Sequence, residues 1–240
     1  RNTMAAPQSP STEPLLTSIL DTLGEQIISG ALEPGYTFTL QDLSTRFGIS
    51  RTVAREVMRA LEQLGLVSSS RRVGIKVLPA EHWSVFNRSV INWRLSCAEQ
   101  RPAQITSLNE LRTAVEPVAA SLAATHATPA QAQRLLELAH LLVELSGAGA
   151  GNTPEFLDAD KEFHTLILHA SGNEMFSTLA DPIMHVLEGR TRYGIMPDEP
   201  SLPAMRIHID LAQAIADGDA SASELASRNL LTGVKEFLAI

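Results

Sequence analysis

This chain of 240 residues has very little cysteine, few aromatic residues and no long apolar run. Its single cysteine, Cys97, excludes an internal disulfide, and its helical apolar setting indicates a core position rather than a redox site. Aromatic residues make up 5% of the chain, and no segment approaches the roughly 20 consecutive apolar residues of a membrane-spanning helix. The N-terminal region is polar and rich in Pro and Ser, unlike a secretion signal. We therefore expect a cytoplasmic protein without membrane contact.

Acidic residues outnumber basic ones, but the two signs are segregated along the chain. Of the formal net charge of −8, residues 1–79 contribute eight Lys and Arg against seven Asp and Glu. The remaining residues contain eleven basic against twenty acidic side chains. Within 46–76, seven basic residues stand against only Glu56 and Glu62. A locally basic segment of this kind is typical of a surface that binds phosphates, so the acidic total does not exclude nucleic acid as a partner.

Residues 40–66 have the pattern of two short helices joined by a glycine-centred turn. Apolar residues at helical spacing predict a small shared core: Leu40, Leu43, Phe47, Ile49, Val53, Val57, Leu61 and Leu64. Gly48 permits the tight turn between the helices. Ser50 is suited to cap the second helix, which is expected to begin at Arg51.

The second of these helices carries a basic stripe. Arg51, Arg55 and Arg59 recur every four residues and therefore lie on one helix face. Such a stripe is often only a solvated surface. Here the turn, the cap and the stripe occur together and in order, which predicts a helix that reads DNA.

These residues resemble the GntR family of bacterial regulators, whose DNA-binding domain is a winged helix-turn-helix. The family's central pattern is matched by Gly48, Ile49, Ser50, Arg51, Thr52, Ala54, Arg55, Glu56, Met58, Leu61, Gly65, Leu66 and Val67. The first helix and its exit are matched by Ile27, Ile28, Gly30, Leu32, Pro34 and Gly35, and the wing by Arg71, Arg72, Val73, Gly74, Ile75, Lys76 and Val77. The resemblance covers residues 15–79, which we predict to form one DNA-binding domain after a disordered tail at 1–14.

The resemblance implies that the second helix contacts double-stranded operator DNA. Arg51 and Arg55 are candidates for base edges or phosphates, because a guanidinium can pair bidentately with guanine or clamp a phosphate. Arg59 extends the same basic face. Ser50 and Thr52 are expected to hydrogen-bond phosphates.

The wing and the first helix of the pair add further candidates. Gly74 is expected at the wing tip, where it would let the hairpin approach the minor groove beside Arg71 and Arg72. The alternative for the two arginines is a solvated hairpin. Gln41 stands where many relatives have an arginine, so their operator preference is not carried over.

From Trp83 onward the pattern is helical almost throughout. Helices are predicted at 83–97, 104–126, 129–146, 154–171, 174–195, 202–217 and 220–238. Pro79 ends the wing strand, so we place the domain boundary near 78–82. The chain is thus predicted to be mainly α, with a winged helix-turn-helix followed by a bundle of about seven antiparallel helices at 83–240.

This second part resembles the FCD domain, the all-helical effector domain of the FadR-like branch of the GntR family. The matching residues are Leu111, Arg112, Glu116, Pro117, Ala119, Ala120, Leu122, Ala123, Ala124, Asp160, Phe163, His164, Leu168, Ala170, Gly172, Asn173, His208, Ala214, Ile215, Gly218, Asp219 and Ala222. The resemblance implies a homodimer with an effector cavity. The stretch HWSVFNRSVINWRL further resembles regulators that sense sugar acids such as galactonate or gluconate.

The resemblance also implies a site for a divalent metal such as Zn, Ni or Mn. Asp160 and His164 match two ligand positions, and their i, i+4 spacing puts both on one helix face. His208 matches the third position. The fourth, usually histidine, is Asn229, whose neutral amide is a poor zinc ligand. The alternative is that Asp160 and His164 form a surface ion pair and His208 is an ordinary polar residue.

Arg112 is the candidate for binding a small carboxylate effector. In the family this arginine points into the cavity, where a guanidinium would hold a carboxylate. The alternative is a surface salt bridge with Glu116 one helical turn away, and both arrangements can coexist. His185 and Arg192 share a predicted helix and are further candidates for the same cavity.

Together these features predict a homodimeric transcription regulator, most simply a repressor, that binds a palindromic operator and senses a small carboxylate, with no enzymatic activity. A metal-dependent enzyme acting on a small acid is the first alternative, although a general base and a nucleophile are not evident. A ligand-independent architectural DNA-binding protein is the second.

Overall fold

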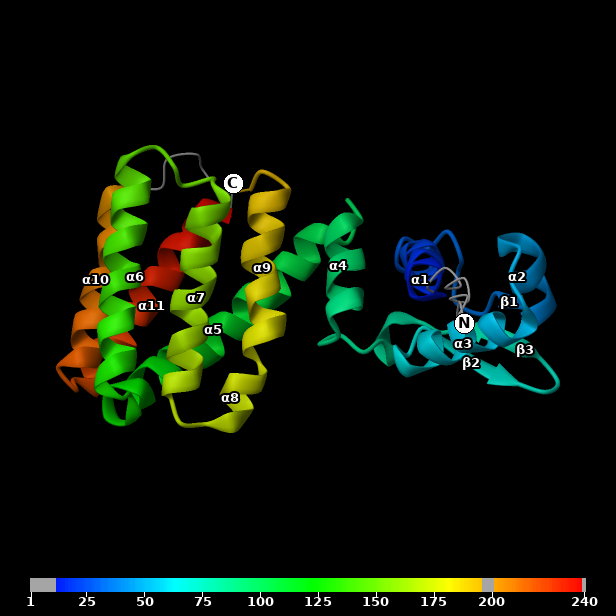
Figure 1. Cartoon of the computed structure of the whole chain (residues 1–240), viewed down its shortest axis with the longest axis horizontal. Coiled ribbons are helices and arrows are strands. Elements are labelled where there is room, and N and C mark those ends of the chain that lie inside the picture. The colour runs from blue at the N-terminus through cyan, green and yellow to red at the C-terminus, as the bar shows by residue number, and fades with distance from the viewer. Residues whose placement is uncertain (1–11, 196–200, 239–240) are drawn as a thin grey trace, which may run out of the picture. The chain divides into compact units, whose positions relative to one another are not determined.

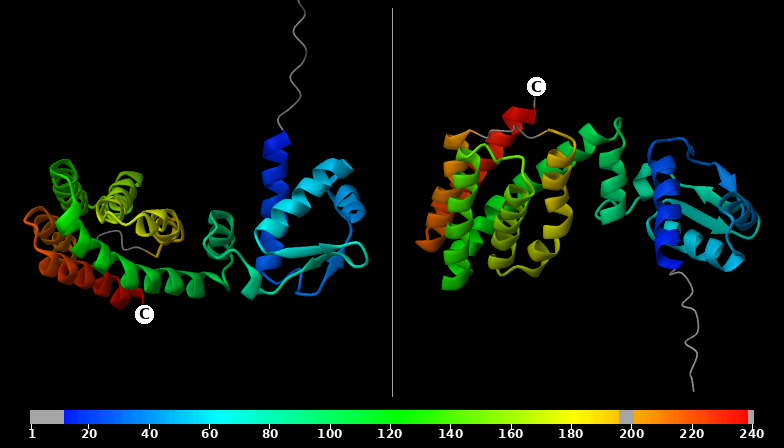
Figure 2. Two further views of the ribbon diagram at one scale, coloured as in Figure 1. Left: turned by 90° about the horizontal axis from the view of Figure 1, so that it is seen from below. Right: turned by 45° about the horizontal axis from the view of Figure 1, so that its top comes forward.

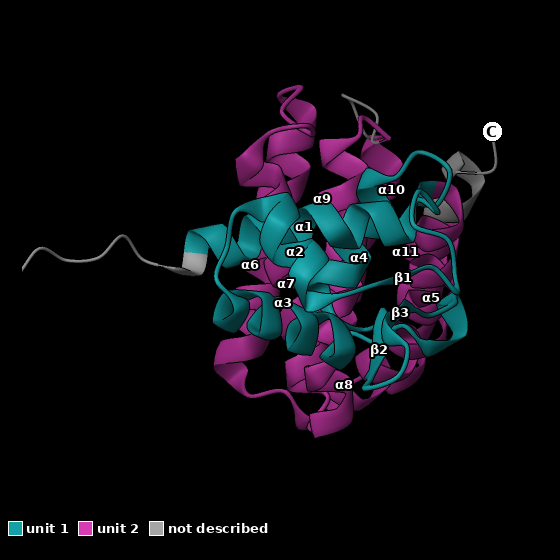
Figure 3. Ribbon diagram, turned by 90° about the vertical axis from the view of Figure 1, so that its right-hand side faces the viewer, with its two compact units in different colours: residues 1–101 teal, residues 102–240 magenta. Residues whose placement is uncertain are grey.

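The structure is a computed structural model that describes residues 12–195 and 201–238. The chain forms two compact units, the first ending at Arg101 and the second beginning at Pro102 (Figure 3). Helices dominate both units, and the described strands all lie in the first (Figure 1). The predicted fold class, a winged helix-turn-helix followed by a helical bundle, is confirmed. None of the described helices is long and apolar enough to cross a bilayer.

The first unit combines helices with a small antiparallel sheet. Its elements are α1 (Thr12–Ile28), β1 (Thr37–Phe38), α2 (Leu40–Phe47), α3 (Arg51–Gln63), β2 (Val67–Ser70), β3 (Gly74–Val77), the 3-10 helix η1 (Ala80–His82) and α4 (Arg88–Ser96). The strand order is β1-β3-β2, with Ile75 opposite both Phe38 and Ser69. The buried faces of α1, α3 and the sheet meet in one apolar core. The tail predicted at 1–14 lies outside the described residues except for 12–14, which form the start of α1.

Local sequence determines where α2 and α3 begin and end. Thr39 and Asp42 form a capping box at the start of α2, in which each side chain accepts a backbone N–H of the other residue. Gly48 ends α2 at φ 64°, a left-handed conformation that favours glycine. The Ser50 hydroxyl accepts the N–H of Val53, and α3 begins at Arg51. The predicted turn, cap and helix start are confirmed.

The helix predicted at 83–97 is shorter than expected and lies in the first unit. The Asn87 side chain accepts the N–H of Ser89, so α4 begins only at Arg88. The Trp93 ring packs over Gly24 of α1, where a Cβ would lie 2.6 Å from the indole. The Trp93 Nε1–H donates to Asp21 at 2.9 Å. These contacts join α4 to α1, and the compact units divide after Arg101 rather than at 78–82.

Within its described residues the second unit contains seven helices, although the helix predicted at 83–97 is not one of them. They are α5 (Arg101–His126), α6 (Pro129–Gly147), α7 (Pro154–Ala170), α8 (Glu174–Thr178), α9 (Ala180–Arg192), α10 (Leu202–Ala216) and α11 (Ala220–Leu238). The single helix predicted at 174–195 is instead two, α8 and α9, separated at Leu179.

The helices of the second unit pack against one another (Figures 1 and 2), and the residues that they bury are mostly apolar. α6 packs against α7 and α10, α7 packs against α9, and α10 packs against α11. α6 and α7 both begin with a Thr cap followed by Pro, as Thr128–Pro129 and Thr153–Pro154. α5 and α7 also meet through side chains, which brings polar groups of both helices into the interior.

Candidate DNA-binding surface and buried Asp/His cluster

The recognition helix α3 presents its arginines on the face opposite its buried residues. Ala54, Val57 and Leu61 are buried in the core of the first unit. Arg51, Arg55 and Arg59 are exposed along the other face, as is Thr52. The stripe predicted from spacing is therefore accessible to a partner from outside this unit.

The polar residues at the start of the two helices have partners within the fold. The Ser50 oxygen accepts the backbone N–H of Val53, and the hydroxyl hydrogen stays available to a phosphate. Gln41 is exposed on the first turn of α2 and donates to the Thr45 hydroxyl at 3.3 Å. Both side chains lie on the surface, and the contact of Gln41 is weak enough to be exchanged for one to DNA.

The structure places Gly74 next to the wing tip and not at the tip itself. The tip of the hairpin between β2 and β3 is formed by Arg71, Arg72 and Val73, all exposed. Gly74 is instead the first residue of β3, with φ 82°, and a Cβ there would lie 2.8 Å from the Phe38 carbonyl oxygen. Glycine is needed at this position because its φ is left-handed and because β1 passes close to β3. The contact of Gly74 with DNA stays a prediction.

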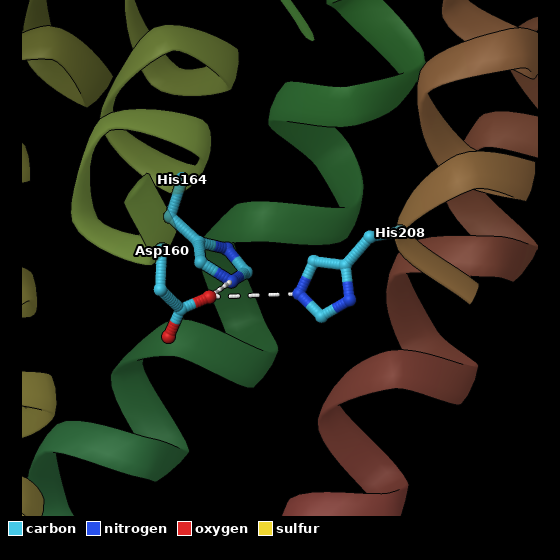
Figure 4. Close-up of side chains that lie close together, drawn as sticks. All are labelled: Asp160, His164 and His208. Carbon is cyan, nitrogen blue, oxygen red and sulfur yellow. Dashed lines mark ion pairs between the residues drawn. The ribbon is translucent and has the colours of Figure 1, made fainter. Parts of the chain in front are cut away.

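In the second unit, Asp160, His164 and His208 meet in a buried cluster (Figure 4). Asp160 and His164 come from one face of α7, and His208 comes from α10. Asp160 Oδ1 lies 3.4 Å from His164 Nε2 and 3.5 Å from His208 Nε2. One potential ligand atom from each residue lies within 4.8 Å of the others. The expectation that these three residues come together is met, and the surface ion pair is wrong because all three are buried.

The charges of this cluster stabilise each other. Burial alone would raise the pKa of Asp160, but hydrogen bonds from His164 and His208 hold it well below its usual value. Burial alone would lower the pKa of His164, but Glu116 and Asp160 outweigh burial and raise it. The site therefore holds an ionised carboxylate, and a metal ion would compete with a proton for His164.

Arg112 and Glu116 form a salt bridge next to this cluster, in the interior and not on the surface. Arg112 is 1% exposed and Glu116 is 2% exposed. Arg112 Nε lies 2.6 Å from Glu116 Oε1, and His164 Nδ1 lies 2.7 Å from Glu116 Oε2. Burial would raise the pKa of Glu116, but Arg112 and then His164 lower it to about 2. Glu116 thus links the arginine to the Asp/His cluster.

The guanidinium of Arg112 keeps one unused donor group. Nη2 lies 3.4 Å from Glu116 and 3.4 Å from the ring nitrogens of His164. Nη1 is buried and has no hydrogen-bond partner among the described residues. A buried N–H without a partner costs about 1–3 kcal/mol, so this position favours an additional acceptor. The salt bridge of Arg112 with Glu116 therefore leaves Nη1 available, so Arg112 can form this salt bridge and bind a ligand at the same time.

Of the two candidates on α9, His185 is buried and Arg192 is not. His185 Nδ1 contacts the Asp181 carbonyl oxygen at 2.7 Å, and its Nε2 lies 4.0 Å from Glu188. Arg192 is exposed, and its guanidinium lies over the ring of Tyr193. The prediction that Arg192 lines the cavity is wrong, because its position in the helix turns it outward.

Arg190 is the buried arginine of α9, and no motif in the sequence singled it out. It is 3% exposed and interacts electrostatically with Arg112 and Asp160. Arg190 follows the buried residues Val186 and Leu187 by four and three positions, so it shares their face of α9. Helical phase was thus the signal that distinguishes it from Arg192.

Asn229 is exposed on α11 and is not a metal ligand in this structure. Up to Gly233, where the description of this helix's side chains ends, the buried positions are Ser223, Ser227, Leu230 and Leu231. They recur at the spacing of one helix face, and Asn229 lies outside that face. The expected fourth ligand position is therefore wrong in register.

Without Asn229, the ligand set of Asp160, His164 and His208 suits a divalent metal with open coordination positions. A carboxylate oxygen and two imidazole nitrogens are ligands that zinc and other first-row metals accept. Three protein ligands leave room for water or a ligand oxygen, as in open metal sites.

A winged helix-turn-helix with an exposed basic helix, joined to a helical unit with a buried polar cluster, defines a DNA-binding transcriptional regulator. The chain belongs to the GntR family of bacterial regulators and carries an FCD domain. Residues 15–77 match the family described as bacterial regulatory proteins, gntR family, and residues 107–233 match the FCD domain.

Individual relatives agree with this assignment. The chain is 30% identical over 217 residues to the galactonate operon transcriptional repressor of Escherichia coli strain K12, covering 89% of this chain and 92% of the relative. It is 27% identical over 220 residues to the regulator LutR of Bacillus subtilis strain 168, covering 88% and 95%. The solved structure of Lar, which controls expression of the Listeria monocytogenes agr system, matches with a TM-score of 0.59 at 14% identity, over 99% of each chain. This last likeness concerns the fold alone.

Proposed function

We propose that this regulator is a homodimeric repressor that binds a palindromic operator and releases it when a small carboxylate enters the second unit. The observation that carries the proposal is the unused Arg112 donor, buried beside Asp160, His164 and His208. A buried guanidinium with a free N–H is suited to bind a carboxylate. The similarity to a galactonate operon repressor favours a sugar acid as this ligand.

The proposed switch acts through the spacing of two recognition helices. A dimer presents one α3 to each half-site, and the half-site spacing is set by the dimer. The acid can lower operator affinity only if it binds more tightly to an arrangement that does not fit both half-sites. We place this activity in the bacterial cytoplasm, where operator DNA is found.

The proposal is tested by titrating a protein–operator complex with small acids. The operator fragment is selected from random duplexes by the wild-type protein, and release is followed by fluorescence anisotropy. At least one acid from a panel including galactonate and gluconate is expected to release the DNA. DNA binding that no acid changes would favour an architectural protein, and turnover of an acid would favour an enzyme.

The same reasoning gives a prediction for the DNA-binding surface. Replacement of Arg55 by Ala is expected to weaken operator binding roughly 5- to 150-fold, the equivalent of about 1–3 kcal/mol for a bidentate contact. Binding of the acid should not change, because Arg55 lies in the first unit. Arg206→Ala on α10 is the matched control, since Arg206 is also an exposed arginine. Equal losses of operator affinity in Arg55→Ala and Arg206→Ala would mean that DNA binding depends only on the net charge of the protein.

We also propose that Asp160, His164 and His208 bind a divalent metal, with Zn, Ni or Mn as candidates. Such an ion would act as a Lewis acid that attracts the carboxylate of the effector. Asp160 supplies the negative charge of the site, and Glu116 holds His164 in place through the contact at Nδ1. A carboxylate contact at the second ring nitrogen, such as that of Glu116 with His164 Nδ1, is of the kind that orients imidazole ligands in metal sites.

Measuring the metal affinity of variants tests whether Asp160, His164 and His208 are ligands and Asn229 is not. His208→Ala is expected to weaken metal binding by at least roughly 10- to 100-fold, the effect of losing even an outer partner of a ligand. Asn229→His should leave it unchanged, because the new imidazole would lie on the exposed face of α11. Both are measured by competition with a fluorescent chelator. Tighter binding by Asn229→His would contradict the placement of α11.

A further inference from the structure

We propose that Arg190 is a second anion-binding residue, which together with Arg112 holds the carboxylate of the effector between two guanidinium groups. This inference rests on the proposed function, in which the second unit senses a small acid. It adds a side chain from a fourth helix, α9, to a site otherwise formed by α5, α7 and α10.

The position of Arg190 supports this role. It lies on the buried face of α9, with 3% of its surface exposed. α9 packs against α7, the helix that carries Asp160 and His164. Arg190 interacts electrostatically with Arg112 on α5 and with Asp160 on α7. Three helices therefore direct charged side chains toward one interior region.

The charges around this region favour an anionic ligand. Burial lowers the pKa of Arg190 to about 10. Repulsion by Arg112 also lowers this pKa, whereas attraction by Asp160 raises it. Glu116 already serves both Arg112 and His164. Two like charges near each other in an interior are costly, and an anion between them would relieve the repulsion.

The unused donor of Arg112 points to the chemistry of this anion. Nη1 of Arg112 is buried without a partner among the described residues. A carboxylate has two oxygens, so one can accept from Arg112 while the other accepts from Arg190. The ligand class is a small carboxylic acid, and the corresponding neutral polyol lacks the group that both arginines would bind.

The experiment compares Arg190 with Arg192, an exposed arginine on the same helix. Calorimetric titration of the metal-loaded dimer uses galactonate, gluconate, short 2-hydroxy acids and the neutral polyol galactitol. For an acid that binds the wild type, Arg190→Gln is expected to weaken binding roughly 10- to 100-fold, as for loss of a hydrogen bond to a charged group. Arg190→Lys keeps the charge without the planar fork and should give an intermediate loss. Arg192→Gln should bind like the wild type.

Metal content and operator binding without acid are measured on the same variants, and both should be unchanged for a residue that acts only on the ligand. Wild-type affinity for the acid in Arg190→Gln or in Arg190→Lys would overturn the inference while leaving the proposed function intact. Equal losses in the Arg192 variant would overturn it as well, because they would reflect surface charge alone. A wild-type protein that binds none of the acids would contradict the proposed function itself, and this inference with it.

Discussion

Replacement of Glu116 by Leu is expected to destabilise the second unit by about 3–5 kcal/mol, because it leaves the guanidinium of Arg112 buried without its counter-charge. Arg112 and Glu116 are both almost fully buried, and Glu116 also contacts His164 at 2.7 Å. Solvent screening therefore weakens this salt bridge little. Urea unfolding followed by far-ultraviolet circular dichroism measures the loss, since most of the helix lies in the second unit.

The double variant Arg112→Met, Glu116→Leu is the matched control. An apolar pair of similar volume replaces the whole salt bridge, which is often neutral or even stabilising. We expect most of the stability lost in Glu116→Leu to return, while the response to the acid stays absent. A double variant as unstable as the single one would show that the contact with His164, and not the charge of Arg112, causes the loss.

Replacement of Trp93 by Ala is expected to destabilise the first unit by about 3–5 kcal/mol. The indole is buried against Gly24 of α1 and donates a hydrogen bond to Asp21, so its removal leaves a cavity and breaks this hydrogen bond. The fluorescence of Trp83 reports the unfolding, because the two tryptophans of the chain both lie in this unit. Operator binding should fail at a lower urea concentration than in the wild type.

Phe86 provides the comparison for this variant. It is an aromatic residue of the same segment but is 56% exposed, so Phe86→Ala should change stability by only about 0.5 kcal/mol or less. A first unit that tolerates Trp93→Ala equally well would mean that α4 is not part of its core. In that case the DNA-binding domain would end near the wing, as the sequence pattern predicts.

The recognition helix shows how far local sequence determines structure. Ser50 caps α3, Gly48 adopts the left-handed turn before it, and Arg51, Arg55 and Arg59 fall on its exposed face, all as predicted. Each of these features depends on residues within one or two helical turns. The amino-acid pattern is therefore sufficient to locate them.

The polar site of the second unit was predictable only in part. The i, i+4 spacing puts Asp160 beside His164 and Arg112 beside Glu116, and both contacts are present. His208 joins them from a separate helix, where family resemblance and not spacing was the guide. Whether these pairs are surface ion pairs or a buried cluster depends on which helix faces pack together.

The errors arose where a neighbouring helix decides the answer. Arg192 was predicted to face the cavity because it shares a helix with His185, but the packing of α9 turns Arg192 outward and buries Arg190. Asn229 was assigned to a ligand position although it faces outward from α11.

By itself the sequence determined the DNA-reading helix, which follows from short spacings and local caps, and it determined the class of protein and the residue types of the buried site through resemblance to a known family. Only the tertiary structure decided that α4 belongs with α1, that Arg112 and Glu116 are removed from water, and that Arg190 is buried on α9. The physical reason is that burial depends on contacts between residues far apart in the chain, and burial determines what a charge costs and what it can bind.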